Sequence, residues 1–173
     1  MQDSGWGLLD GMNGDGLAAA LAFGGRKVHG KGFGIPLVVR YVLETCATVE
    51  EACATLARVP VHMSYSVTLV DRGARTATVF LNPDRAPEVI ERAWCTNQQN
   101  RVEWDEYSAF THTPARADAL ARTASDPALS PRELIERQRG RAWARAVDKS
   151  ELEGFRSRMT VIASRLREGR TVI

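Results

Sequence analysis

Residues 48–81, TVEEACATLARVPVHMSYSVTLVDRGARTATVFL, decide the fold class because the spacing of their apolar residues changes partway. From Val49 to Leu56 apolar residues recur three and four positions apart, which is typical of an amphipathic helix. After Pro60 the period falls to two, and apolar residues alternate with polar ones from Val61 to Leu69. A helix followed directly by a half-buried strand indicates a protein of the α+β class.

The residues before this stretch add a hairpin, a loop and another helix. Turn residues at 10–16 lead into a short apolar strand at 17–23, which is rich in alanine. A glycine-rich basic loop follows at 24–34. Helical spacing returns at 35–46, and Thr48 begins a capping box that starts the next helix. These patterns predict two successive short helices packed beside a strand.

The residues after it add more strands and then helices. After the strand that follows Pro60, segments 75–81 and 89–95 are two further predicted strands. The loops between them are too short for a parallel crossover, so the sheet must be antiparallel. Helices are predicted at 115–123 and from Ser130 onward, and a hairpin at 160–173. The result is an α+β layered sandwich forming a single domain over 1–173.

Composition excludes several classes of protein. The chain has 44% hydrophobic and 25% charged residues and a net charge of +2, which is an ordinary globular balance. No stretch approaches the ~20 apolar residues that a membrane helix needs, so we expect no membrane association. The three cysteines form an odd count without metal-ligand spacing. They indicate reduced thiols and a cytoplasmic location.

Residues 132–170 carry eleven basic against six acidic side chains. The acids are interleaved and no aromatic platform accompanies the arginines, so we interpret this region as a solvated helix face and expect no nucleic-acid partner.

Little in the sequence points to a metal or a cofactor. The three histidines, His29, His62 and His112, are far apart, and no carboxylate accompanies them at ligand spacing. The glycine-rich loop lacks the Lys-Ser/Thr of a phosphate-binding loop. Its basic residues, Arg26 among them, could still meet an anionic substrate. We therefore expect no metal and no cofactor.

Asn97 stands where a predicted strand ends, in a cluster of amides at 97–99. An amide fixed at such a position can donate to the negative oxygen that develops during acyl transfer. An asparagine that merely caps a turn fits the same pattern. Spacing alone leaves both interpretations open.

Several short motifs, in order, resemble a known family. They are DGMNGDGL at 10–17, FGGR at 23–26, GFGIPL at 32–37, RYVLE at 40–44, TVEEA at 48–52 and the Thr-Asn pair at 96–97. Together they resemble the N-terminal-nucleophile hydrolases of the acyl-coenzyme A:6-aminopenicillanic acid acyltransferase branch, peptidase family C45. The resemblance covers residues 5–116 and fades over 117–173. It implies a four-layer αββα sandwich.

The resemblance also implies roles for individual residues. The family nucleophile is a cysteine made N-terminal by autoproteolysis, whose own α-amine can serve as the base. Asn97 would be the oxyanion donor, and a family arginine would fall at Arg116. The loop at 24–34 would line the acyl pocket, with Arg26, Phe33 and Tyr65 binding substrate. A second oxyanion donor, an asparagine in related hydrolases, would fall at Ala22, which cannot donate.

The chain departs from the family in its nucleophile. Relatives carry the cysteine well before the Gly-Met-Asn hairpin, whereas Cys46, Cys53 and Cys95 all follow it. We therefore expect an incomplete domain, lacking its N-terminal cysteine strand and truncated at the C-terminus. The expected activity is amide hydrolysis or acyl transfer on a small-molecule acyl amide or thioester, for which this chain alone is catalytically incomplete. The alternative is a non-catalytic module that binds an acyl ligand. An oligomer, or the missing N-terminal segment as partner, is also expected.

Overall fold

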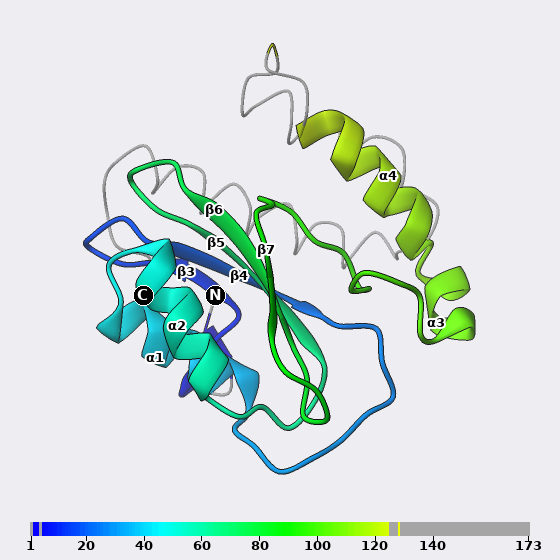
Figure 1. Ribbon diagram of the computed structural model, residues 1–173, viewed down its shortest axis with the longest axis horizontal. Helices are drawn as coiled ribbons and strands as arrows, with labels where there is room; N and C mark the ends of the chain where they lie inside the picture. The colour runs from blue at the N-terminus through cyan, green and yellow to red at the C-terminus, as the bar shows by residue number, and fades with distance from the viewer. Residues whose placement is uncertain (1, 4, 125–127, 129–173) are drawn as a thin grey trace.

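A five-stranded antiparallel sheet forms the centre of the computed structural model, which describes residues 2, 3, 5–124 and 128 (Figure 1). Its strands lie side by side in chain order: β3 (Asp10–Met12), β4 (Ala18–Phe23), β5 (Tyr65–Val70), β6 (Thr76–Leu81) and β7 (Glu88–Ile90). A separate two-stranded hairpin joins β1 (Gln2–Asp3) to β2 (Gly7–Leu8). The predicted antiparallel pairing is confirmed.

Helices α1 (Ile35–Thr45) and α2 (Val49–Arg58) cover one face of this sheet (Figure 1). Thr48 caps α2 by accepting a hydrogen bond from the Glu51 amide, and Glu51 in turn accepts from the amide of Ala47. Asn13 ties the β3–β4 hairpin to the end of α1, because its side chain donates to the carbonyl oxygens of Leu43 and Cys46. Both predicted helices are confirmed at nearly the expected bounds.

The core lies between these helices and the sheet. Alternate residues of the three central strands point into it, for example Val67 and Leu69 of β5. The helices contribute these buried side chains to the core: Ile35, Val38, Val39, Val42, Ala52 and Leu56. Burial of this apolar surface is the main force holding the layers together.

The opposite face of the sheet has a different character. Strand alternation gives this face Ala18, Ala20 and Ala22 of β4, and Ser66 and Thr68 of β5. The chain after β7 returns across this side, and α3 (Asp105–Phe110) and α4 (Thr113–Ala124) lie beyond it, away from α1 and α2 (Figure 1). This face is the one that positions the candidate site.

Two predicted strands have different bounds in the structure, and one helix was not predicted. The strand predicted from Val61 begins only at Tyr65, because residues 61 and 63 form isolated bridges with the 24–34 loop. The strand predicted at 89–95 ends at Ile90, because the residues after it leave the ladder to cross the sheet face. Helix α3 was not predicted at all. The helix from Ser130 and the terminal hairpin lie outside the described residues.

Candidate functional site

The site is built on the segment 91–99, which crosses the sheet face opposite to α1 and α2. The hydroxyl of Thr78 on β6 donates to the carbonyl oxygen of Arg92 at 2.8 Å. The hydroxyl of Thr68 on β5 donates to the sulfur of Cys95 at 3.3 Å. Partly buried side-chain bonds from two strands therefore hold the start of the segment in place.

Gln99 fixes the C-terminal end of the segment 91–99. This buried side chain donates to the Ser64 hydroxyl and to the carbonyl oxygen of Tyr65, each at 3.1 Å, and to that of Leu81 at 3.3 Å. Its own oxygen accepts from the Asn82 amide at 2.9 Å and from Arg85. Because every polar atom of Gln99 is used, the segment has one position relative to β5 and β6.

The backbone of Gly25 packs against the middle of this segment. Gly25 has a φ of +72°, and a Cβ placed on it would overlap the carbonyl oxygen of Asn97. Glycine is therefore needed here both for its conformation and for the close approach. This contact fixes the backbone of Asn97 from the side of the 24–34 loop.

The structure brings together the two catalytic residues predicted from the sequence. Arg116, on α4, donates from Nη1 to Oδ1 of Asn97 at 3.2 Å. Burial lowers the pKa of Arg116, but an arginine remains protonated at neutral pH. The bond therefore joins a permanent cation to the amide oxygen of Asn97.

Tyr107 of α3 approaches the same pair. Burial raises the pKa of its phenol, while the charge of Arg116 and a side-chain hydrogen bond with Asn97 oppose that rise. The ring stacks on Trp104 with centroids 4.9 Å apart and meets Phe23 edge-on at 5.5 Å. Lys27 lies over the Trp104 ring at 4.2 Å. An aromatic cluster thus lies beside the Asn97–Arg116 pair.

Cys95 is the cysteine nearest to this pair. Burial raises the pKa of its thiol, although the Thr68 hydrogen bond and the charges of Arg92 and Arg116 oppose the rise. The thiol is therefore protonated at neutral pH, and a protonated thiol is a poor nucleophile. The other cysteines lie in the helical layer on the other side of the sheet, Cys46 buried and Cys53 partly buried.

The three residues predicted to bind substrate lie elsewhere. Arg26 is 14% exposed and its guanidinium binds Asp84, Glu103 and Asn82, so its charge is already paired. Phe33 is exposed on the loop, and its backbone bonds to Pro60 and His62. The phenol of Tyr65 donates to the sulfur of Met63. Their role in binding substrate stays a prediction.

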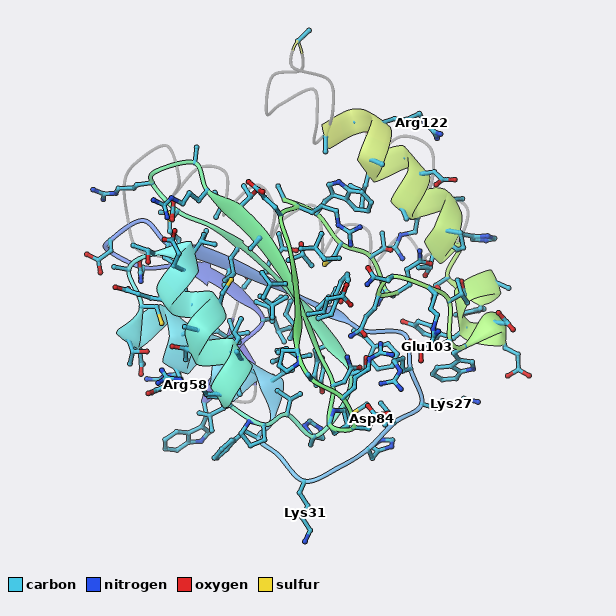
Figure 2. The ribbon with its side chains drawn as sticks, in the orientation of Figure 1. Lys27, Lys31, Arg58, Asp84, Glu103 and Arg122 are labelled. Carbon is cyan, nitrogen blue, oxygen red and sulfur yellow. The ribbon has the colours of Figure 1, made fainter. Side chains whose placement is uncertain are left out.

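Figure 2 shows the loop side of this arrangement, where Asp84 and Glu103 lie near each other and the side chain of Lys31 projects away from the fold. Arg26, between Asp84 and Glu103, ties the glycine-rich loop to the segments after β6 and before α3. Arg85 adds a second cation to Glu103 at 2.9 Å. Among the described residues no cluster of His, Cys, Asp and Glu could hold a metal ion.

Sequence reasoning missed Tyr107 and Gln99. Tyr107 belongs to a short helix with a weak apolar pattern, so no periodicity marked it. Gln99 lies in the amide cluster singled out for Asn97, but its role depends on strand ends that are far away in the sequence. In the part of the chain that the structure describes, no helix is long and apolar enough to cross a membrane.

Comparison with known proteins agrees with the family resemblance described above. The family model of acyl-coenzyme A:6-aminopenicillanic acid acyl-transferases matches residues 1–137. No curated protein sequence matches the chain. Among solved structures, the Caenorhabditis elegans ortholog of N-acylethanolamine-hydrolyzing acid amidase (NAAA) is similar with a TM-score of 0.53 and 15% identity, over 76% of this chain and 62% of that one.

Penicillin V acylase from Agrobacterium tumefaciens is 23% identical over 93% of this chain and 53% of that one, with a TM-score of 0.44. The chain therefore spans less than two thirds of the length of either structure. The fold is that of the N-terminal-nucleophile hydrolases. Of the four layers of that fold, the described residues contain the α1–α2 layer and the five-stranded sheet.

Proposed function

Because the chain belongs to the acyl-coenzyme A:6-aminopenicillanic acid acyl-transferase family, we propose that Asn97 and Arg116 form the oxyanion-binding part of an acyl-transfer site. The reaction is cleavage of an amide or thioester bond, with hydrolysis or transfer of the acyl group. The substrate is a small-molecule acyl amide or thioester. Within this family we assign the chain to peptidase family C45 and to the cytoplasm.

The bond between Arg116 and Asn97 carries this proposal. A guanidinium has only donors, so the atom of Asn97 that faces it must be the amide oxygen. The Nδ2 group, with its two hydrogens, is then directed away from Arg116. One hydrogen can serve the Tyr107 phenol, and the other can donate to a substrate oxygen.

This donor would act at the step that forms the tetrahedral intermediate. As a nucleophile attacks the carbonyl carbon, negative charge develops on the carbonyl oxygen, and the Asn97 Nδ2 group donates to it. A single donor of this kind contributes about 10²–10³ in rate in known enzymes. The positive charge of Arg116 polarises the amide and holds it in the productive orientation, which avoids reorganisation during the reaction.

None of the three cysteines suits the attacking role. Burial raises the pKa of both Cys53 and Cys95, and Cys46 lies in the core at the end of α1. We propose that the nucleophile is the N-terminal cysteine typical of the family, supplied from outside these 173 residues, and that the chain alone does not complete the reaction.

A non-catalytic module that binds an acyl ligand is the second candidate. The protonated thiol of Cys95 beside an intact Asn97–Arg116 pair favours it, because that arrangement can bind an oxyanion without attacking a carbonyl.

The oxyanion site, which both candidates share, can be tested on the purified chain. We expect no release of amine or thiol from N-acyl ethanolamines or acyl-coenzyme A esters, and saturable binding of a fatty carboxylate such as decanoate, measured by calorimetry. Asn97→Ala should weaken that binding. Turnover that disappears in Cys95→Ala would show instead that the chain carries its own nucleophile, and a wild-type chain that does not bind decanoate would refute the proposed oxyanion site.

A further inference from the structure

Arg92 is a partly buried arginine whose charge no carboxylate of the described residues neutralises. Its Nε atom is buried without a hydrogen-bond partner. Burial lowers the pKa of Arg92, and no carboxylate is among the groups that oppose this shift. The acidic residues close to it in the sequence do not pair with it, since Glu88 accepts a hydrogen bond from Asn100 and Glu91 is exposed.

Arg26 shows how the same fold accommodates another guanidinium inside the structure. Asp84 and Glu103 bind it, and their hydrogen bonds raise the pKa of Arg26 although burial opposes the rise. Burial of a charge without such a partner costs free energy. Arg92 therefore carries a charge that is available to an anion from outside the described residues.

Aromatic rings determine which part of the Arg92 guanidinium is available. Its central carbon lies 4.1 Å from the centroid of the Trp94 ring and 5.5 Å from that of the Phe80 ring. The hydroxyl of Thr78, two residues before Phe80 on β6, holds the Arg92 backbone on this face of the sheet. A guanidinium that stacks on a ring keeps its edge free for hydrogen bonds. Nε is its only nitrogen that is enclosed without a partner, so the two Nη groups are accessible at that edge.

A second cation acts on the same place. Burial raises the pKa of the Cys95 thiol, and the charges of Arg92 and Arg116 are among the influences that oppose the rise. Both guanidinium groups therefore contribute positive potential around the Cys95 sulfur. Positive potential in a partly buried site raises the local concentration of anions.

We propose that Arg92, stacked on Trp94, forms an anion-binding site that takes a carboxylate or a phosphate group. The edge of the guanidinium donates two parallel hydrogen bonds to two oxygens of the anion, a geometry that an ammonium group cannot match. Binding involves hydrogen bonds and charge pairing, with no covalent step. The site does not use the Asn97 amide, so it goes beyond the function proposed above.

Nuclear magnetic resonance of the tryptophan indole groups tests this site on the whole chain. Inorganic phosphate and acetate are titrated separately at constant ionic strength, with chloride as the reference anion. We expect at least one of them to shift the Trp94 indole N–H signal saturably, which identifies the group that binds. In Arg92→Gln the affinity should be about tenfold weaker, because charge-assisted hydrogen bonds are lost.

Arg58→Gln is the matched control, because it removes the same charge from an exposed arginine in the last turn of α2, on the other side of the sheet. It should leave the affinity unchanged. Trp6, which is 77% exposed, reports non-specific effects of the anion within the wild-type spectrum.

The wild-type titration can refute the site without any variant. The site is overturned if neither anion shifts Trp94 saturably, or if Trp6 shifts in the same way as Trp94. Equal affinity in Arg92→Gln and the wild type also overturns it. Failure of decanoate to bind would refute the function proposed for Asn97 and leave the Arg92 site in place.

Discussion

Gly25 lies against the backbone of Asn97 so closely that no side chain fits between them, and its φ of +72° is one that other residues adopt at a cost. The loop after β4 therefore sets the position of the candidate oxyanion donor. A glycine in the loop and an asparagine more than seventy residues later act as one structural unit.

Substitution at Gly25 tests whether its close contact with the Asn97 backbone stabilises the fold. We predict that Gly25→Ala lowers the free energy of unfolding by about 1–3 kcal/mol, because it adds both left-handed strain and a clash with the Asn97 carbonyl. Gly14→Ala is the control, since a Cβ at Gly14 meets no atom within 4 Å. Urea denaturation of both variants gives the comparison, and equal stability of the two would contradict the account.

A second prediction concerns Gln99. Gln99→Leu keeps the size of the side chain but leaves the buried Asn82 amide and Ser64 hydroxyl without this partner. Each unsatisfied buried group costs about 1–3 kcal/mol, so we expect a loss in that range or above it. Gln98→Leu is the control, because the Gln98 side-chain oxygen has no partner among the described residues. If chemical denaturation shows the same loss in both variants, Gln99 does not anchor the segment.

The fold was largely predictable because its signals are local. The capping box at Thr48 and the alternation predicted at 61–69 depend on neighbouring residues. The capping box appears in the structure as expected, and the alternation forms strand β5 from Tyr65 onward. The end of β7 was not predictable, because Thr78 and Thr68 draw residues 92–95 out of the ladder by long-range bonds. Apolar alternation cannot reveal a bond to a distant strand.

The candidate site was predictable only in part. Asn97 and Arg116 came from motifs, and the structure places them in contact. The place of Tyr107 beside this pair depends on which face of the sheet the chain crosses, which no local pattern encodes. The positive charge of Arg26 led to the prediction that it binds substrate. The structure pairs that charge with Asp84 and Glu103, which are 58 and 77 residues away.

The ion pairs of Arg26 predict a specific acid sensitivity. Its hydrogen bond lowers the pKa of Asp84. Burial alone would raise the pKa of Glu103, but hydrogen bonds from Arg85 and Arg26 outweigh it and the pKa is lowered. Both carboxylates therefore stabilise the fold fully above their ordinary pKa values of about 4, and this contribution is lost as the pH falls below that range.

We expect Arg26→Gln to be less stable than the wild type at pH 7 and to approach it near pH 3, as measured by denaturant unfolding at each pH. Arg40→Gln is the control, because the interactions it breaks are exposed: the pair of Arg40 with Glu44, an i, i+4 pair worth about 0.3–0.5 kcal/mol, and a hydrogen bond to the carbonyl oxygen of Trp6. A constant difference between Arg26→Gln and the wild type from pH 7 to pH 3 would refute the linkage.

The orientation of the Asn97 amide is the central claim, and nuclear magnetic resonance can observe it directly. During titration with decanoate, we predict a saturable downfield shift of one Asn97 Nδ2 proton in the wild type. The shift should be lost or much weaker in Arg116→Met, and retained in Arg122→Met, which changes an exposed arginine of the same helix. Decanoate binding that leaves the Asn97 amide unshifted, or an unchanged shift in Arg116→Met, would contradict the account.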